Sequence, residues 1–337
     1  MKKFLGLLLI MLMFAACDNA QYTEYGGEIT AVSGEELVSM SVSQAEAERQ
    51  KLEEEEEIEQ LIEESEAELS RITIADRIGG TVEVPEPAGE TLRIVSCSPA
   101  ISEILSGLGL MGEIIAADTN SADVFGVAPE ICTLDMMNLN TQYIADLEPD
   151  IVIIGEISEQ FGDPISELED MGIYTAYIPA ANSIEGIKMD IEFLAGLTGM
   201  QNAGGELISA INTDLLYIEE LVGGLTPKNV FFEVSGTPEI YAVAEDNFLA
   251  DMIKRAGGQT VLTDKSGFVP LTADEVLSLS GVDVYITNVE DGNPDYIYVD
   301  TNLTSRPSQN FPAGIREIAK ILHPEAFPDE STEEIPA

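Results

Sequence analysis

The stretch Asp150-Ile151-Val152-Ile153-Ile154-Gly155 decides the fold class. Its four central residues are all β-branched and apolar, which favours a strand, and Gly155 ends the run. A continuous apolar run of this kind indicates a parallel strand covered by other elements on both faces. A helix is predicted next over 164–171 and a further strand over 173–178. The stretch is therefore one βα unit of an α/β lobe.

The same alternation of strands and helices begins at Arg71. Two strands, 72–75 and 81–84, flank Gly79-Gly80 and predict a hairpin. Further strands are predicted over 92–96 and 113–117, with a helix over 101–110 between them. These elements and the deciding stretch form one lobe, residues 71–182.

Apolar residues then recur at helical spacing from Ser183 to about Val222. Gly199 and the pair Gly204-Gly205 interrupt this segment, which predicts two helices. A second α/β series follows, with strands over 229–234, 240–244, 282–287 and 296–299, and helices over 247–256, 272–279 and 313–322. We therefore predict two α/β lobes, 71–182 and 226–328, joined by a helical segment over 183–225. A ligand cleft is expected at their junction.

The N-terminus predicts export. Lys2 and Lys3 precede an apolar run, Phe4–Phe14, that is shorter than the roughly 20 residues a bilayer-spanning helix needs. The run ends in Phe14-Ala15-Ala16-Cys17, which resembles the lipobox of bacterial lipoproteins. That resemblance implies a signal peptide over residues 1–17 and a diacylglyceryl group on Cys17, although Leu is more usual than Phe14. Two acyl chains hold a protein stably at a membrane. An ordinary cleaved signal with an incidental Cys is the alternative.

Charge is the outlier of the composition: 15 basic residues face 62 acidic ones, for a net charge of −47. Nucleic acid is therefore not expected as a partner, because phosphate binding needs clustered Lys and Arg. Residues 18–70 carry 17 of the acids and are interpreted as an acidic tether, either a solvated helix or a disordered arm. Residues 329–337 form an acidic tail.

The sulfur and imidazole groups predict little metal chemistry. Cys97 and Cys132 are candidates for unpaired structural thiols, for a disulfide that export would allow, or for ligand contact. The single His323 precedes Pro324 at a predicted helix end, and a structural role is expected there. One His disfavours a directly His-ligated metal site.

The order and spacing of several motifs resemble a known family. They are Asp76-Arg77-Ile78-Gly79-Gly80-Thr81-Val82, Ile94-Val95-Ser96-Cys97-Ser98-Pro99, Glu103-Ile104-Leu105, Gly107-Leu108-Gly109, Leu147-Glu148-Pro149-Asp150, Ile253, Ala256-Gly257-Gly258, Arg306-Pro307, Gly314-Ile315 and Ile318-Ala319-Lys320-Ile321-Leu322-His323-Pro324. Residues 71–328 are similar to the ABC-importer solute-binding proteins that serve iron-siderophores, haem and cobalamin. The resemblance implies a class III periplasmic-binding-protein fold, in which two Rossmann-like lobes are bridged by one long α-helix and move little on binding. It also implies a non-enzymatic monomer on the extracytoplasmic face of the cell membrane. Its partners would be a permease with its ATPase, and a small ligand.

Ligand contacts are expected from loops at the carboxyl ends of strands facing the cleft. The candidates are Cys97, Ser98, Pro99, Phe125, Phe161, Tyr241, Phe268 and Arg306. The aromatic candidates offer flat apolar surface to a macrocycle, unless they are core residues. The Arg306 guanidinium either binds an anionic group on the ligand or caps local backbone.

The resemblance also implies that one acidic residue on each lobe docks on permease Arg. The matching positions are Gln142 and Asp274, and Gln142 carries no charge. Asp146 and Glu275 are neighbouring candidates. Plain exposed helix residues are the alternative for all four.

Beyond residue 70, 45 acidic residues face 11 basic ones. A highly anionic catecholate siderophore would need several basic residues in the cleft, so a corrinoid or a hydroxamate chelate fits better. A surface lipoprotein for sensing or adhesion is an alternative function. An α/β enzyme is less favoured, because the first strand lacks a following GxGxxG, no GxSxG occurs, and one His leaves little acid–base capacity.

Overall fold

The computed structural model describes residues 73–155, 162–236, 239–290 and 292–327. Every described residue belongs to one unit of the chain, residues 71–337. The predicted signal peptide, the acylated Cys17, the acidic tether and the tail all lie outside the described residues. Within them, no helix combines the length and apolar character needed to cross a bilayer.

The N-terminal lobe contains a parallel sheet of five strands in the order β5-β4-β3-β6-β7. Its strands are β3 (Ile94–Cys97), β4 (Ile114–Asp118), β5 (Cys132–Leu134), β6 (Ile151–Ile154) and β7 (Thr175–Tyr177), and its helices are α3 (Pro99–Gly107), α4 (Thr141–Asp146) and α5 (Pro164–Asp170). A separate antiparallel hairpin, β1 (Thr73–Ala75) with β2 (Thr81–Glu83), precedes them.

Strand β6, the apolar run after Asp150, is buried on both faces. Ile151 and Ile153 enter the main core of the protein, whereas Val152 and Ile154 enter a second cluster on the opposite face of the sheet. Asp150, just before the strand, accepts hydrogen bonds from the backbone N–H groups of Ala88 and Arg93, both at 2.8 Å. This carboxylate fastens the segment that leads into β3, the neighbouring strand.

The C-terminal lobe contains a mixed sheet in the order β11-β9-β8-β12-β13, with β10 also paired to β8. Its strands are β8 (Lys228–Ser235), β9 (Ile240–Val243), β10 (Gly258–Thr260), β11 (Phe268–Leu271), β12 (Val284–Thr287) and β13 (Ile297–Tyr298), and its helices are α8 (Phe248–Arg255), α9 (Ala273–Leu277), α10 (Thr301–Ser305) and α11 (Phe311–Leu322). Strands β9 and β11 run antiparallel to their neighbours, and the other pairings are parallel.

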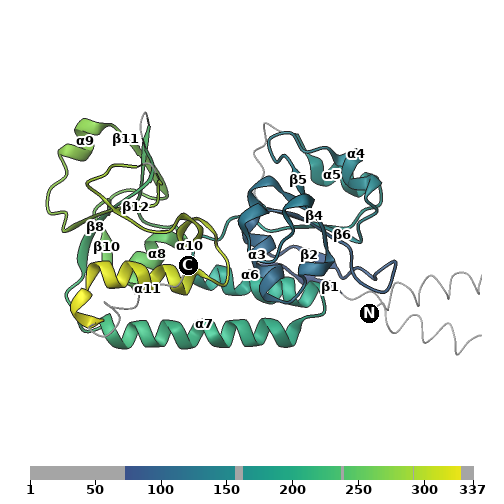
Figure 1. Ribbon diagram of the computed structural model, residues 1–337, viewed down its shortest axis with the longest axis horizontal. Coiled ribbons are helices and arrows are strands. Elements are labelled where there is room, and N and C mark those ends of the chain that lie inside the picture. The colour runs from purple at the N-terminus through teal and green to yellow at the C-terminus, as the bar shows by residue number, and fades with distance from the viewer. Residues whose placement is uncertain (1–72, 156–161, 237–238, 291, 328–337) are drawn as a thin grey trace, which may run out of the picture. The chain divides into compact units, whose positions relative to one another are not determined.

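Two consecutive helices join the lobes. They are α6 (Ile184–Leu197) and the 22-residue α7 (Gln201–Val222), which runs beneath both lobes (Figure 1). The main core continues through them, from Ile104 on α3 through Ile191 and Ile218 to Phe232 and Ile315 in the C-terminal lobe. Because apolar side chains of both lobes share one buried cluster, separating the lobes would expose that cluster to water.

Most predicted elements are confirmed, with ends shifted by one to three residues. The break at Gly199, whose φ is +74°, is confirmed, but the predicted break at Gly204-Gly205 is wrong. Both glycines lie inside α7, and a Cβ on Gly204 would come within 2.5 Å of the Ala195 side chain. Gly204 is therefore where α7 crosses α6 closely. The short elements β5, β10, β11, α4 and α10 were not predicted.

The two-sided burial of β6 makes its side chains sensitive to truncation. Ile153→Ala is expected to lower the free energy of unfolding in urea by about 2–5 kcal/mol, because it leaves a cavity in a fully buried core. Ile78→Ala deletes the same atoms at a site that is 59% exposed, and serves as the matched control with a loss below about 1 kcal/mol. Equal losses for the two variants would contradict the assignment of the core.

Candidate ligand-binding site

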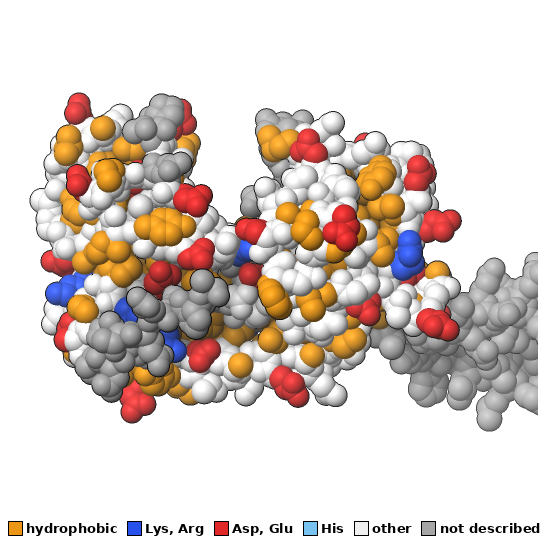
Figure 2. Space-filling view, in the orientation of Figure 1, with side chains coloured by type: hydrophobic (Ala, Val, Ile, Leu, Met, Phe, Trp, Pro, Cys, Tyr) orange, Lys and Arg blue, Asp and Glu red, His pale blue; other side chains and the backbone are white. Residues whose placement is uncertain are grey.

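A cavity of about 280 Å³ lies where segments from both halves of the chain meet. Its lining is mostly apolar and comes from the ends of β3, β4 and β6, the start of α3, the 178–181 segment, α6, the end of α10 and the two residues that follow α10. Figure 2 shows that the molecular surface is also hollowed between the two lobes. The carboxyl ends of parallel strands thus supply the N-terminal wall, as expected for an open α/β sheet.

The wall formed by β3 and β6 depends on Gly155. A Cβ at this position would lie 2.9 Å from the Ser98 Cβ, closer than side chains tolerate. Gly155 therefore lets the β3–α3 turn pass directly beside the end of β6. Cys97, Ser98 and Pro99 on that turn all line the cavity.

The Cys97 side chain contributes a thiol rather than a thiolate. Burial, and secondarily the nearby Asp118 carboxylate, raises the pKa of Cys97 to about 12. Cys97 and Cys132 are both free thiols, so the predicted alternative of a disulfide is wrong. A thiol held protonated at neutral pH acts as a small apolar group.

Asp118, at the end of β4, is a buried carboxylate in the cavity lining. It accepts hydrogen bonds from the Ser121 hydroxyl and, at 2.8 Å, from the Asn120 backbone N–H. The buried hydroxyls of Ser121, Ser102 and Ser96 continue this contact as a chain, with oxygen separations of 2.9 and 2.8 Å. Burial raises the pKa of Asp118, while the contacts from Ser121, Asn120 and Arg306 oppose that rise. The chain holds the Asp118 loop against β3 and α3.

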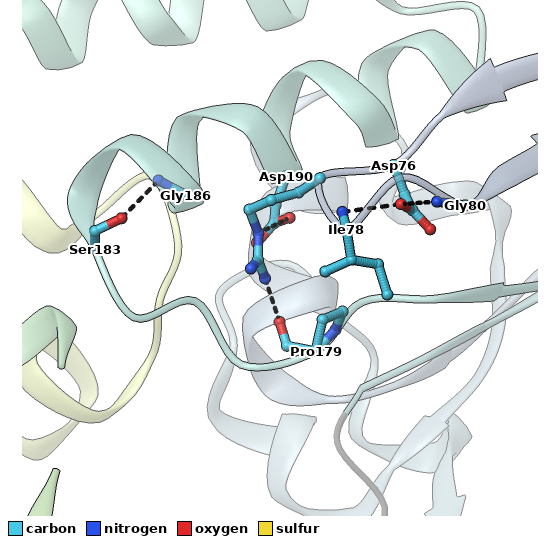
Figure 3. Close-up of polar contacts among 8 residues, drawn as sticks. Asp76, Ile78, Gly80, Pro179, Ser183, Gly186 and Asp190 are labelled. Atoms are coloured by element: carbon cyan, nitrogen blue, oxygen red, sulfur yellow. Dashed lines mark hydrogen bonds and ion pairs between the residues drawn. The ribbon is translucent and has the colours of Figure 1, made fainter. Parts of the chain in front are cut away.

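A second carboxylate in the lining, Asp190 on α6, is paired with Arg77 from the β1–β2 turn. The Arg77 Nε and Nη2 lie 2.9 and 3.3 Å from the two Asp190 oxygens, and Nη2 also donates to the Pro179 carbonyl at 2.6 Å (Figure 3). The Asp76 carboxylate shapes the turn by accepting from the N–H groups of Ile78 and Gly80. Burial raises the pKa of Asp190, and the contact with Arg77 opposes it. The Arg77 side chain thus fixes the 178–181 wall to α6.

The opposite wall is the segment after α10. The Arg306 Nη2 lies 2.5 Å from the Asp123 Oδ1, on the 3₁₀ turn η2 (Thr119–Asp123) of the N-terminal lobe. The Ser308 hydroxyl donates to the Glu103 carboxylate, and the Gln309 amide donates to the Glu103 carbonyl at 2.7 Å. Residues 306–309 therefore connect the lobes at a second place, apart from α6 and α7.

Four of the eight predicted ligand residues come together in this cavity: Cys97, Ser98, Pro99 and Arg306. Phe161 lies outside the described residues. Phe125 is 90% exposed and does not line the cavity. Tyr241 and Phe268 lie on the paired strands β9 and β11 of the C-terminal lobe, also outside the lining. Sequence reasoning missed Asp118 and Asp190, although Asp118 sits at the carboxyl end of a predicted strand.

The predicted docking positions lie on α4 and α9, which are at the ends of their lobes opposite α7 (Figure 1). On α4, the Gln142 amide donates to Asp146 at 2.9 Å. On α9, the Glu275 carboxylate closes a capping box with Thr272, and those hydrogen bonds hold the pKa of Glu275 below its usual range. Asp274 is exposed. Leu277 beside it is 82% exposed.

His323 has the structural role expected of it. It is buried and its Nε2 lies 2.9 Å from the carbonyl oxygen of Gly257, whose φ is +82°. No group of three or more His, Cys, Asp or Glu side chains in the described part of the chain is placed to hold a metal ion.

Comparison with known proteins decides the family. The model of the family described as periplasmic binding protein matches residues 94–319, about two thirds of the chain. The chain belongs to the periplasmic binding protein family. It is therefore a solute-binding protein of the ABC-transporter type, as the motifs predicted, and its family is not enzymatic.

A sequence relative and several solved structures agree with this assignment. The ABC transporter substrate-binding lipoprotein YvrC of Bacillus subtilis (strain 168) is 26% identical over 280 residues, which cover 77% of this chain and 88% of YvrC. A possible iron-binding protein of Staphylococcus epidermidis ATCC 12228 superimposes with a TM-score of 0.60 at 23% identity, covering 69% of this chain and 98% of that one.

Two further structures share the fold at lower identity. The vitamin B12-binding protein BtuF of Vibrio cholerae gives a TM-score of 0.60 at 17% identity, covering 70% and 97% of the two chains. The molybdate-binding protein MolA of Haemophilus influenzae gives 0.63 at 17% identity, covering 77% and 94%. These matches confirm the predicted class III fold, in which two α/β lobes are joined by a long helix.

The state of Cys97 can be tested by alkylation. Iodoacetamide is expected to leave Cys97 unmodified in the folded chain up to about pH 9, because burial raises the pKa of the thiol to about 12 and thiolate is the reactive form. Half-buried Cys132 is expected to react sooner, and both should react alike in urea. Peptide mass spectrometry distinguishes the two sites. Native-state modification of Cys97 at the rate of Cys132 would contradict the assignment.

Proposed function

We propose that this chain is the extracytoplasmic binding component of an ABC importer for a metal chelate or tetrapyrrole, that is, a ferric siderophore, haem or cobalamin. It would bind the ligand between its lobes and deliver it to a permease with its ATPase. The observation that carries the proposal is the cavity itself, because both halves of a periplasmic-binding-protein body contribute to its lining. Cys97, Ser98, Pro99 and Arg306 are the proposed contacts there, with Phe125, Phe161, Tyr241 and Phe268 as proposed contacts around the wider hollow.

The apolar lining supports a ligand that hides its metal. Bare metal ions need several carboxylate, imidazole or thiolate ligands, and the described residues offer no such group. The cavity, at about 280 Å³, is at the small end for a ligand pocket and would enclose only part of a macrocycle. A corrinoid or haem would therefore extend into the hollow between the lobes, whereas a compact hydroxamate chelate would be more fully enclosed.

The family and its relatives support the rest of the assignment. YvrC is a lipoprotein, which agrees with the proposed diacylglyceryl group on Cys17. This chain would then be anchored to the cell membrane on its extracytoplasmic face, with the binding unit attached through residues 18–70 and acting as a monomer. The structural relatives named above are a possible iron-binding protein, a vitamin B12-binding protein and a molybdate-binding protein, so their shared fold does not select one ligand.

Docking on the permease is proposed to use α4 and α9. Asp274 is the favoured carboxylate on the C-terminal lobe because the Glu275 carboxylate is engaged by Thr272. On the N-terminal lobe, Gln142 supplies no charge and is hydrogen-bonded to Asp146, so Asp146 is the proposed anion.

A binding screen tests the proposed function. Purified full-length chain should gain thermal stability with a ferric trihydroxamate, cyanocobalamin or haem, since a ligand at 100 times its Kd adds about 2.7 kcal/mol. Ala100→Phe, which places a ring in the cavity, should weaken binding of the active ligand by at least about tenfold. Ala122→Phe adds the same ring at an exposed position outside the lining and should bind normally. If none of these ligands stabilises the chain, the proposal is overturned.

The docking assignment is tested separately from binding. Asp274→Lys should reduce stimulation of ATP hydrolysis by the reconstituted permease–ATPase complex by about tenfold, because it sets like charges against each other across the interface. Its affinity for ligand should be unchanged. Asp214→Lys, on an exposed part of α7, makes the same charge change as a control. Normal stimulation by Asp274→Lys would exclude Asp274 from the interface.

A further inference from the structure

The cavity contains one basic side chain among its described lining residues, and that side chain is already paired. The Arg306 side chain is only 10% exposed, and its Nη2 lies 2.5 Å from the Asp123 Oδ1. Asp123 is not in the lining, and its own side chain is 55% exposed. The guanidinium is thus held beside the cavity by a carboxylate at the surface.

Arg306 has hydrogen-bonding capacity left over. Its guanidinium carries five N–H donors, and in the described structure it donates one hydrogen bond, to Asp123. The remaining donors can serve a neutral acceptor, such as an amide or hydroxamate oxygen, without a change in net charge. An anionic ligand group gains less, because Asp123 already compensates the positive charge.

The other charged groups at the cavity do not supply a positive field. Asp190 is compensated by Arg77, which holds both of its oxygens. Asp118 has no cationic partner within hydrogen-bonding distance and accepts from Ser121 and Asn120 instead. Pairing every cation with an anion leaves the described cavity wall neutral or slightly negative.

We propose that Asp123 is a specificity-determining residue, which neutralises Arg306 and so biases the cavity toward uncharged, acceptor-rich ligands and against polyanions. This inference rests on the proposed function, since it concerns the ligand of the same site. Asp123 acts through Arg306 and is not itself a ligand contact. The proposed role of Asp123 is electrostatic. Removing its charge should therefore change the preference between neutral and anionic ligands, whereas the loss of a structural residue would weaken the binding of both.

The test compares two ferric chelates of different charge. Three hydroxamates, each singly negative, cancel the charge of Fe³⁺, whereas three catecholates, each doubly negative, leave a trianion. The full-length chain is titrated with each chelate by calorimetry. Asp123→Asn removes the charge and keeps an oxygen that can accept from Arg306, so the fold should be retained, which a thermal melt checks.

We expect the wild-type chain to prefer the neutral chelate. Asp123→Asn should raise affinity for the trianionic chelate by about tenfold to a hundredfold, in line with the strength of hydrogen bonds to charged groups, and change affinity for the neutral chelate by less than about threefold. Asp214→Asn, which makes the same change in net charge on exposed α7, should alter neither affinity. The double variant Asp123→Asn with Arg306→Gln should lose the gain, which assigns the effect to Arg306.

Two results overturn the inference, and they are distinguishable. If the wild-type chain binds the neutral chelate and Asp123→Asn leaves the preference unchanged, Asp123 does not set ligand charge, while the proposed function stands. If neither chelate, nor cyanocobalamin or haem, binds to the wild type or to the variant, the proposed function fails and the inference fails with it.

Discussion

The structure depends on an apolar core that continues from one lobe to the other. Ile191 on α6 and Ile218 on α7 belong to the same buried cluster as Ile104 in the N-terminal lobe and Phe232 in the C-terminal lobe. A large separation of the lobes would hydrate this cluster, which is unfavourable in proportion to the apolar area exposed. The contacts of residues 306–309 with Glu103 and Asp123 add a second connection. Binding is thus expected to involve small lobe movements around a largely formed site.

The arrangement of the two lobes determines which groups line the cavity. Strand ends of the N-terminal lobe supply Cys97, Gly155 and Asp118, and the segment after α10 closes the other side with Arg306. Burial keeps the thiol protonated, and the carboxylates are held by hydroxyl, backbone or guanidinium donors. We propose that such a wall recognises shape and hydrogen-bond acceptors more than charge. This fits ligands in which a chelator or macrocycle surrounds the metal.

Much of this architecture could be predicted from the sequence because the strong signals are local. The run Ile151–Ile154, the glycine at 199 and the helical periodicity of 183–222 each specify an element without reference to distant residues. The short strands β5, β10 and β11 lack such signals. Each forms by pairing with a strand that is already part of a larger sheet. At Gly204 the local signal is misleading. The glycine predicts a helix end, but it lies inside α7 and allows α6 and α7 to pack closely.

The site was predictable in part for the same reason. Cys97, Ser98 and Pro99 follow a predicted strand, and ligand contacts are expected at the carboxyl ends of parallel strands. The pairing of Arg306 with Asp123 joins residues 183 positions apart, and no sequence spacing indicates it. Ring chemistry makes Phe125 and Phe268 candidates, but Phe125 lies on an exposed loop and Phe268 on strand β11, and neither placement is specified by a local sequence signal.

We expect one small molecule to occupy the cavity at the junction of the lobes. Native mass spectrometry of the chain purified from its own cells tests it most directly. A one-to-one complex is expected, with an added mass that matches a ferric chelate, haem or corrinoid, and Ala100→Phe should be recovered without that mass. Retention of the same added mass by Ala100→Phe would contradict this expectation, because the ligand would then be bound elsewhere.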